Sequence, residues 1–335
     1  MKTVRIGGFR VSNGGRPFVV AEAGINHNGE LEKARRMIRA AKRAGADAVK
    51  FQTFRAEEFV ADPRQMFTYR SRGRTVTESM LAMFKRYEFS EPQWRTIKRE
   101  CDRIGIMFLS TPQNLSDLKI LLRLGVKAVK VGSDDFTNTP LLRSYALTGL
   151  PLILSCGMAD MAEVKEALGA VGALRGYPTI LLACTSQYPT PPRDANLLRI
   201  RTLAKAFPGI PIGFSDHTQG PSASSLAVAL GAPFLEKHFT LDHGLPGPDH
   251  WFSCDPRELA QWVFAIRRAS VLMGNGAVEP TAAERRMRVL ARRSVAALRE
   301  ILKGERLTGE NVGLRRPGKG LAPSRYESVL GKTAA

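Results

Sequence analysis

The chain has 335 residues, of which 44% are hydrophobic and 24% are charged, and this composition is typical of a globular protein. Its length is sufficient for one large barrel or for two domains. The net charge of +19 favours acidic partners. However, the basic residues are dispersed and accompany no zinc finger, RNP-like aromatic motif or basic arm, so we expect no nucleic-acid binding.

Apolar runs that resemble buried strands alternate with segments whose apolar residues recur at helical spacing. The expected strands span 18–24, 48–53, 106–111, 128–132, 151–156, 179–185, 211–215 and 234–239. The expected helices span 31–44, 92–104, 115–124, 139–148, 161–174, 195–206, 221–230 and 256–274. Eight such strand–helix units predict an α/β fold, a (β/α)8 TIM barrel. An open doubly wound sheet is the alternative, but no Gly-rich dinucleotide turn follows the first strand.

The domain boundaries follow from where the strand–helix units end and from the polar and then β-rich sequence that comes after them. The barrel is expected to occupy 1–275, with a long connection over 55–90 that we expect to serve a substrate. A polar stretch over 276–290 is interpreted as a linker, and 291–335 as a small β-rich module. A module of this size buries little core alone and must pack on something.

Features of the sequence also indicate the cellular location. The first residues lack the basic-then-apolar pattern of a signal segment, and no apolar run approaches the roughly eighteen residues of a membrane span. Four cysteines lie far apart, without the spacing of metal ligands: Cys101, Cys156, Cys184 and Cys254. We therefore expect a cytoplasmic protein with buried, reduced thiols and no membrane partner.

Two histidines stand at the ends of neighbouring expected strands, His217 after 211–215 and His238 within 234–239. The carboxyl ends of the strands of a parallel barrel meet at its catalytic mouth, so these two rings are expected to converge. Two imidazoles leave coordination positions open, which suits Mn²⁺, Mg²⁺, Fe²⁺ or Co²⁺ better than a closed structural zinc site. The alternative is a pair of hydrogen-bonding histidines on the barrel rim.

Lys50 and Lys130 interrupt two apolar strands, where an unpaired charge costs several kcal/mol. A phosphate or carboxylate of a ligand is the natural partner, and a Schiff-base lysine is the competing role. Glu22, at the end of the first strand, and Asp249, in a stiff Gly-Pro loop, are candidate acid/base residues. Further polar residues lie at or just beyond strand ends: Gln52, Thr111, Ser133, Ser155, Ser186, Tyr188 and Ser215.

The sequence motifs around these residues, in this order, resemble the sialic acid synthase (N-acetylneuraminate synthase) family, including its pseudaminic and legionaminic acid synthases. The motifs that carry the resemblance include Ala21-Glu-Ala-Gly-Ile-Asn-His-Asn-Gly29, Val49-Lys-Phe-Gln-Thr53, Val129-Lys-Val-Gly-Ser133, Gly213-Phe-Ser-Asp-His-Thr218, Glu236-Lys-His-Phe-Thr240 and Pro246-Gly-Pro-Asp249. The piece Arg315-Arg-Pro-Gly-Lys-Gly320 resembles the SAF (antifreeze-like) domain of this family, which usually continues one or two strands further than 335.

The resemblance implies condensation of phosphoenolpyruvate with an N-acetylated amino sugar such as N-acetylmannosamine, with release of phosphate. It implies that His217 and His238 hold the divalent metal, most simply Mn²⁺. It implies that phosphoenolpyruvate is held by Lys50, Gln52, Thr111, Lys130, Ser133, Ser155, Ser186 and Ser215. Glu22, Tyr188 and Asp249 would meet the sugar, and Arg316 would reach the partner's active site in a domain-swapped homodimer.

Several alternatives remain open from the sequence. Either Glu22 or Asp249 can be the acid/base, and departures from the family pattern at Cys156, Ala183 and Ser186 leave the sugar unassigned. The competing functions are another phosphoenolpyruvate- or aldehyde-using barrel synthase or aldolase, and a barrel that binds a sugar or phosphate without catalysis.

Overall fold

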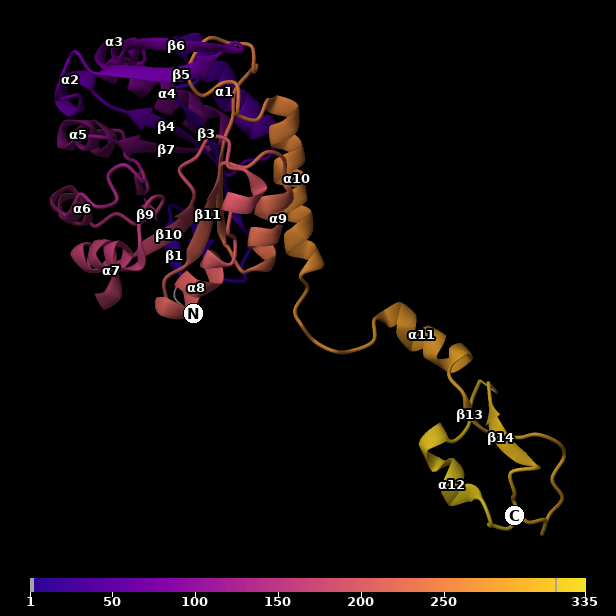
Figure 1. The fold of residues 1–335 in the computed structure, drawn as a ribbon. Coiled ribbons are helices and arrows are strands. Elements are labelled where there is room, and N and C mark those ends of the chain that lie inside the picture. Colours follow the sequence, from indigo (N-terminus) through magenta and orange to yellow (C-terminus); the bar gives the residue numbers. More distant parts are fainter. Residues whose placement is uncertain (1–2, 317) are drawn as a thin grey trace. The chain divides into compact units, whose positions relative to one another are not determined.

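The computed structural model describes residues 3–316 and 318–335, which form two compact units, Met1–Met273 and Gly274–Ala335 (Figure 1). The first unit contains an eight-stranded parallel sheet with helices outside it. The second contains a two-stranded sheet and short helices.

The sheet of the first unit is a nearly closed barrel. Its strands are β3 (Phe18–Gly24), β4 (Ala48–Thr53), β7 (Met107–Pro112), β8 (Val129–Val131), β9 (Leu152–Ser155), β10 (Thr179–Cys184), β11 (Ile212–Asp216) and β12 (Phe234–His238). All neighbouring pairs are parallel, β12 pairs with β3, and the edge strands β7 and β8 contact each other. The predicted TIM barrel is confirmed, and the open doubly wound sheet is not formed.

The helices follow the strands as the apolar spacing predicts. They are α1 (Leu31–Arg43), α4 (Glu91–Ile104), α5 (Leu115–Arg123), α6 (Thr139–Ala146), α7 (Met161–Ala170), α8 (Arg199–Ala206), α9 (Ser222–Ala229) and α10 (Pro256–Leu272), with 3₁₀ turns η1 (Ala173–Arg175) and η2 (Pro192–Asp194). Local sequence sets their ends. In α4, Ser90 and Gln93 form a capping box, and Gly105 ends the helix at a φ of 68°.

A hairpin that precedes the barrel closes its amino-terminal end. The hairpin consists of β1 (Val4–Ile6) and β2 (Phe9–Val11), which pair antiparallel. Its inward side chains share a buried cluster with residues near the starts of the barrel strands, namely Val4, Ile6, Val11, Phe18, Ala48, Ile153, Ile180 and Phe234. The barrel interior at this end is therefore packed side chains rather than a channel, which leaves the opposite end for chemistry.

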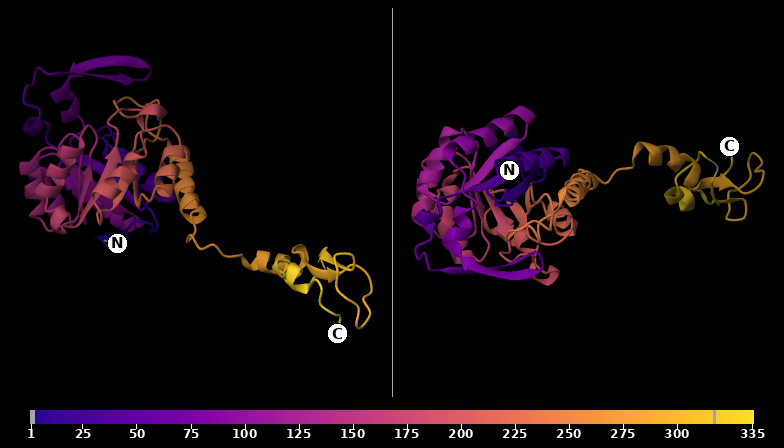
Figure 2. Two further views of the ribbon diagram at one scale, coloured as in Figure 1. Left: turned by 60° about the horizontal axis from the view of Figure 1, so that its bottom comes forward. Right: turned by 90° about the horizontal axis from the view of Figure 1, so that it is seen from above.

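The long connection over 55–90 is structured. It contains α2 (Ala56–Phe59), an antiparallel hairpin of β5 (Met66–Ser71) and β6 (Arg74–Ser79), and α3 (Met80–Lys85). Figure 2 shows this hairpin arching beyond one end of the barrel. A separate apolar cluster under it is built from Ile25, Phe54, Met83, Tyr87 and their neighbours.

The second unit begins with a helix that the sequence analysis did not predict. The segment 276–290, which we interpreted as a linker, contains most of α11 (Ala282–Ala291), and a capping box between Thr281 and Glu284 starts this helix. The expected β-rich part contains β13 (Ser294–Ala297) paired antiparallel with β14 (Val312–Arg315). The turn η3 (Pro323–Arg325) and α12 (Tyr326–Val329) follow.

The structure also describes the cysteines and the lengths of the helices. All four cysteines are buried and free, as expected. Among the helices within 3–316 and 318–335, none is both long enough and apolar enough to cross a membrane.

Replacing Ile6 tests whether the amino-terminal hairpin belongs to the barrel core. Ile6 is fully buried, so Ile6→Ala should lower the free energy of unfolding by about 2–5 kcal/mol through lost burial and a cavity. Denaturant unfolding measures this, with Arg5→Ala on the exposed face of the same strand as control. An unchanged unfolding midpoint for Ile6→Ala would show that the hairpin contributes nothing to the core.

Candidate active site

A cavity of about 680 Å³ collects the polar residues at the carboxyl ends of the barrel strands. Every site residue that the sequence predicts in the first unit lines it: Glu22, Lys50, Gln52, Thr111, Lys130, Ser133, Ser155, Ser186, Tyr188, Ser215, His217, His238 and Asp249. These residues come from seven of the eight strands and from the loops that follow them. The parallel barrel therefore brings together side chains that are more than 200 positions apart in the sequence.

Four charges lie at the floor of this cavity, each on a residue at most 4% exposed. The Lys50 Nζ atom is 2.9 Å from Glu22 Oε2 and 3.5 Å from Glu236 Oε1. The Lys130 Nζ atom is 3.7 Å from the same Glu236 oxygen. Glu236 thus bridges two lysines that would otherwise be close, uncompensated cations in a poorly solvated site.

Burial and charge separate the pKa values of these groups. Burial, only partly offset by Lys50, raises the pKa of Glu22 to about 7. Burial also lowers the pKa of Lys130, whereas at Lys50 the carboxylates of Glu22 and Glu236 outweigh burial and raise the pKa. Glu22 can therefore exchange a proton near neutral pH while Lys50 stays charged, which is the division expected in an acid/base site.

Hydroxyl groups complete the coordination of the two lysines. Lys50 Nζ donates to Thr111 Oγ1 at 3.2 Å, and Lys130 Nζ donates to Ser155 Oγ at 2.8 Å. Ser215 Oγ donates to Glu236 Oε1 at 3.3 Å. The result is a row of cations and hydroxyls at the floor, which suits a ligand with phosphate and carboxylate groups.

The remaining predicted hydroxyl and amide residues lie around this floor. Ser133 Oγ accepts a hydrogen bond from the Gly157 backbone N–H at 3.0 Å. The Ser186 Oγ atom is buried and has no partner among the described residues. Gln52 lies on the cavity wall at the end of β4, beside Thr111 on β7. Ser186 therefore has an open donor and acceptor directed at whatever fills the cavity.

The two predicted metal-binding histidines converge, with ring centroids 5.6 Å apart. His217 Nδ1 is 2.8 Å from the carbonyl oxygen of Thr185, so Nδ1 carries the hydrogen, and Nε2 lies 3.5 Å from Ser215 Oγ. His238 Nδ1 is buried and has no hydrogen-bond partner in the described part of the chain. Tyr188 packs against both rings, with centroid separations of 4.2 Å and 5.7 Å.

Three functional groups surround Gly24, each within van der Waals distance of where a Cβ atom would lie. A Cβ atom at this position would lie 3.4 Å from Glu22 Oε1, 3.6 Å from His238 Cε1 and 3.7 Å from Asp249 Oδ2. The φ of Gly24 is 50°, a conformation that favours glycine. Asp249, which lies on a loop, therefore meets the strand-borne Glu22 and His238, and burial raises its pKa to about 6.

The donors present fit a divalent cation. A histidine ligand must be a neutral imidazole, and burial lowers the pKa of His238 well below its ordinary value. The Asp249 Oδ2 atom is 3.9 Å from His238 Nδ1, so a carboxylate stands beside the imidazoles. Two nitrogen donors with carboxylate oxygens nearby suit Mn²⁺ and similar ions.

Outward-facing neighbours hold the two histidine-bearing strand ends in register. Asp216 and Lys237 are paired across β11 and β12, and their side chains form a buried ion pair of 3.1 Å. The Asp216 carboxylate also accepts hydrogen bonds from Ser224 Oγ at 2.6 Å and from Thr218 Oγ1 at 2.7 Å. The charges outside the barrel therefore alternate with the functional side chains inside it.

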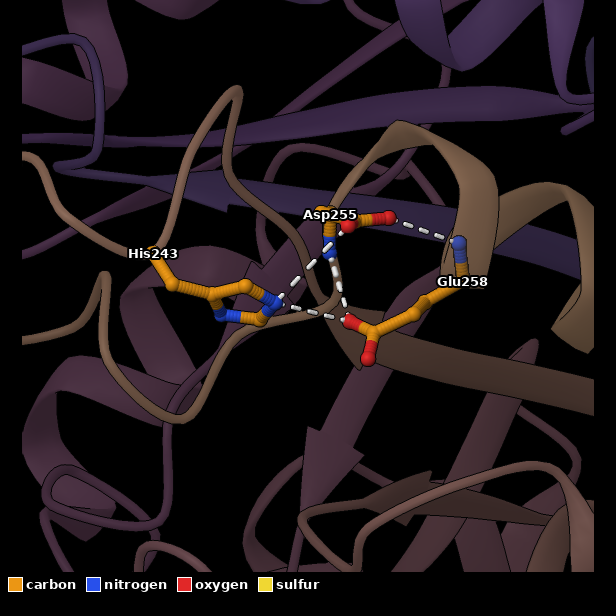
Figure 3. A group of neighbouring side chains, drawn as sticks. All are labelled: His243, Asp255 and Glu258. Carbon is orange, nitrogen blue, oxygen red and sulfur yellow. Dashed lines mark hydrogen bonds and ion pairs between the residues drawn. The ribbon is translucent and has the colours of Figure 1, made fainter.

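A second histidine group lies elsewhere in the same unit. His243, Asp255 and Glu258 bring ligand-type atoms within 4.8 Å of one another (Figure 3). Both carboxylates already serve the capping box of α10, in which Asp255 accepts from the Glu258 N–H and Glu258 accepts from the Asp255 N–H. His243 is 3.0 Å from Glu258 Oε2. This geometry is that of a helix start reinforced by a histidine.

The outer wall of the cavity is aromatic. Phe67 and Tyr69 reach it from β5, and Trp251 and Phe252 reach it from the loop after β12. The Arg70 guanidinium lies 5.1 Å from the centre of the Trp251 ring, which joins the hairpin to that loop. The cavity therefore has a charged floor and an apolar wall, a combination that suits a ligand with an anionic end and methyl-bearing groups.

Glu236 is the residue of the floor that the sequence analysis did not select. It lies within the expected strand 234–239, two positions before His238, so the alternation of a strand already placed both side chains on one face. Arg316, in contrast, lies outside this unit: it is exposed and directly follows β14 in the second unit. The role of Arg316 therefore stays a prediction.

Comparisons with known proteins match both units. The profile of the NeuB family matches residues 37–278, and that of the SAF domain matches residues 292–335. The chain is 40% identical to the N,N'-diacetyllegionaminic acid synthase of Legionella pneumophila over 97% of this chain and 94% of that protein. It is 37% identical to the human N-acetylneuraminate-9-phosphate synthase over 94% of this chain and 88% of that protein.

A solved structure shows the same architecture. The N-acetylneuraminic acid (sialic acid) synthetase from Leptospira borgpetersenii, in complex with citrate, has a TM-score of 0.76 at 35% identity. The match covers 85% of this chain and 94% of that chain. These comparisons confirm the resemblance that the sequence motifs indicate.

Removing the Glu236 carboxylate should make anion binding more sensitive to pH. Burial lowers the pKa of Lys130, and the negative charge of Glu236 partly offsets this effect. In Glu236→Gln that charge is lost, so Lys130 should release its proton at a lower pH than in the wild type. The affinity for inorganic phosphate should therefore fall earlier as the pH rises from about 6 to about 9, measured by calorimetry. Asp47→Asn, which removes a carboxylate paired with Arg267, is the control. Parallel pH profiles for Glu236→Gln and wild type would contradict this role.

Proposed function

Since the chain belongs to the NeuB family of sialic-type acid synthases, enzymes that join phosphoenolpyruvate to an amino sugar, we propose that it condenses phosphoenolpyruvate with an N-acetylated amino sugar in a metal-dependent reaction. The observation that carries the proposal is the floor of two buried lysines, two carboxylates and hydroxyls beside the histidine pair. N-Acetylmannosamine and diacetamido sugars are the acceptors to test.

The charged floor suits phosphoenolpyruvate. Lys50 and Lys130, with Thr111 and Ser155 bound to them, offer cations and hydroxyls to the phosphate and carboxylate groups. An arriving anion competes with Glu22 for Lys50, and loss of that ion pair raises the pKa of Glu22 further from about 7. Substrate binding and protonation of Glu22 are therefore coupled.

His217 and His238 would hold the metal beside this floor. A bound divalent cation supplies a Lewis acid that polarises the aldehyde of the open-chain sugar. Tyr188 packs against His217 and Phe252 packs against His238, so aromatic rings flank both imidazoles. Asp249, whose Oδ2 atom is 3.9 Å from His238 Nδ1, would meet the sugar.

The reaction that balances is an attack of C3 of phosphoenolpyruvate on the aldehyde carbon, with water adding at C2 and phosphate leaving by C–O cleavage. The product is a 2-keto acid extended by three carbons. A group that holds a proton near neutral pH is needed for the aldehyde oxygen and the water. Glu22 and Asp249, with pKa values raised to about 7 and about 6, both qualify.

Phosphate release from phosphoenolpyruvate tests the proposal. The enzyme should release phosphate with Mn²⁺ and one of N-acetylmannosamine, its 6-phosphate and the two diacetamido sugars that lead to pseudaminic and legionaminic acids. Removing metal with a chelator should stop the release, and His217→Ala should reduce it by about 10³-fold or more because a ligand is lost.

Other outcomes would favour the competing functions. Metal-independent turnover with borohydride trapping on Lys50 or Lys130 would indicate a Schiff-base aldolase. Tight binding of phosphoenolpyruvate without release, with every sugar and every metal, would indicate a barrel that binds without catalysis. Undiminished turnover in His217→Ala would overturn the metal assignment.

We also propose that the second unit supplies Arg316 to the barrel of a partner subunit in a swapped homodimer. The support is the exposed position of Arg316 after β14 and the match of 292–335 to the SAF domain. A guanidinium is a suitable donor for an acetyl carbonyl oxygen. Such an arrangement makes each active site from two chains.

Mixing two inactive variants tests this arrangement. Arg316→Ala and Lys130→Ala should each be nearly inactive alone, but a heterodimer would contain one complete site. Refolding an equal mixture should recover about a quarter of the wild-type activity, because half the dimers are mixed and each has one good site of two. If the Arg316→Ala protein keeps full activity, or if the mixture gains nothing, the swapped arrangement is wrong.

A further inference from the structure

The turn after β3 holds the loop that follows β12. Asn28 Nδ2 donates a hydrogen bond to the carbonyl oxygen of Pro246 at 2.8 Å. Its Oδ1 atom is 2.9 Å from Nε2 of His250, a residue with no solvent exposure. The other ring nitrogen, Nδ1, is 2.6 Å from the hydroxyl of Thr240. One histidine thus connects the turn, the end of β12 and the loop.

The neighbouring asparagine in the same turn makes a parallel set of bonds. Asn26 Nδ2 donates to the carbonyl oxygen of Phe239 at 2.9 Å and to Ser253 Oγ at 3.0 Å. Ser253 Oγ in turn donates to the Asp249 carbonyl oxygen at 2.5 Å. The backbone of Asp249 is therefore tied to β3 through two side chains.

The hydrogen-bond partners fix the protonation of His250. Because the Asn28 amide nitrogen donates to Pro246, its oxygen faces His250, and His250 Nε2 must carry the hydrogen. Nδ1 is then the acceptor at 2.6 Å from the Thr240 hydroxyl, whose other neighbour, the Asp242 carbonyl oxygen, is farther away at 3.1 Å. Both polar atoms of a neutral imidazole are satisfied, so the ring is held in one orientation.

The loop approaches this ring too closely for any side chain at Gly247. A Cβ there would lie 2.9 Å from His250 Cδ2 and 3.3 Å from Asn28 Oδ1, and the φ of Gly247 is 143°. The Gly247 N–H donates to Ser71 Oγ of the β5–β6 hairpin at 3.1 Å. Backbone, ring and amide are thus packed without space for displacement.

We propose that His250 and Asn28 are positioning residues, which fix Asp249 in the cavity for the sugar without touching either substrate. The inference rests on the proposed function in that it takes Asp249 to meet the sugar. Lys50 and Lys130 are carried by barrel strands and keep their places through the sheet. Asp249 has no such support, because it lies in the loop between β12 and α10. Loss of the hydrogen bonds of His250 and Asn28 should therefore impair the sugar end of the site and spare the phosphoenolpyruvate end.

The experiment compares replacements of His250 that keep or remove the bond to Asn28. His250→Ala should lower kcat/KM for the sugar by about 100-fold, the effect of a displacement of about 1 Å in a reacting group. The KM for phosphoenolpyruvate should change by less than about twofold, because the strand-borne floor is untouched. His250→Gln places an amide N–H near the former Nε2 and should restore most of the sugar kcat/KM.

Two further variants keep the test decisive. Asn28→Asp still accepts from His250 but loses the donor to Pro246, so it should show a smaller, sugar-selective defect even if His250→Ala fails to fold. His243→Ala removes the other imidazole of the same loop, which serves the start of α10, and should leave both substrates unaffected. Equal losses for both substrates, or no recovery in His250→Gln, would overturn the positioning role.

Failure of the proposed function is distinguishable from failure of this inference. If none of the sugars makes the wild-type protein release phosphate, the proposed function is wrong. Hydrogen exchange of residues 241–254 then tests the positioning role of His250 and Asn28 by itself. Exchange should be faster than wild type in His250→Ala and Asn28→Asp, and close to wild type in His250→Gln and His243→Ala. Unchanged exchange in His250→Ala and in Asn28→Asp would overturn the positioning role.

Discussion

Four ionisable groups buried at one end of a packed barrel impose the main constraint on this structure. Two lysines and two glutamates, each on a different strand, are removed from water and stay compatible only through one another. Their mutual compensation requires correct placement of β3, β4, β8 and β12 at once. The barrel provides this placement because its opposite end is filled by side chains and closed by the amino-terminal hairpin.

The site consists of two kinds of group that differ in how they are supported. The floor is carried by strands, and the sheet fixes its geometry. The wall and Asp249 are carried by loops, which are held by side-chain hydrogen bonds and by the contact of Arg70 with Trp251. The charged floor is rigid, whereas the wall is carried by loops. Substitutions in the wall could therefore change which acceptor is preferred without moving the charged groups of the floor.

The sequence predicts the strands well because a doubly covered parallel strand must be apolar along its whole length, and a lysine within such a run is conspicuous. That reasoning finds Lys50, Lys130 and both histidines. It fails to give the β5–β6 hairpin, whose strands have largely exposed and polar faces and are held by contacts beyond the local sequence. It also misses α11, because every residue of this helix is exposed and no buried apolar face marks it. Only the capping box indicates where the helix starts.

Other contacts of the site join residues that are far apart in the chain, and no spacing along the sequence predicts them. The proximity of Asp249 to Glu22 results from bonds between segments more than 200 residues apart, such as that from Asn26 to Ser253. The inward direction of Glu236 could be predicted from strand alternation. Its bridging of two lysines could not, because it depends on the strand order that brings β4, β8 and β12 round the same interior.

The paired register of β11 and β12 has a consequence for how such a protein can change. Inward His217 and outward Asp216 are adjacent, as are inward His238 and outward Lys237. An insertion or deletion of one residue within either strand would turn its histidine ring toward the helices and the charge of Asp216 or Lys237 into the cavity. This chain can therefore change in length without loss of the site in the loops that follow β11 and β12, whereas changes within these strands must be substitutions.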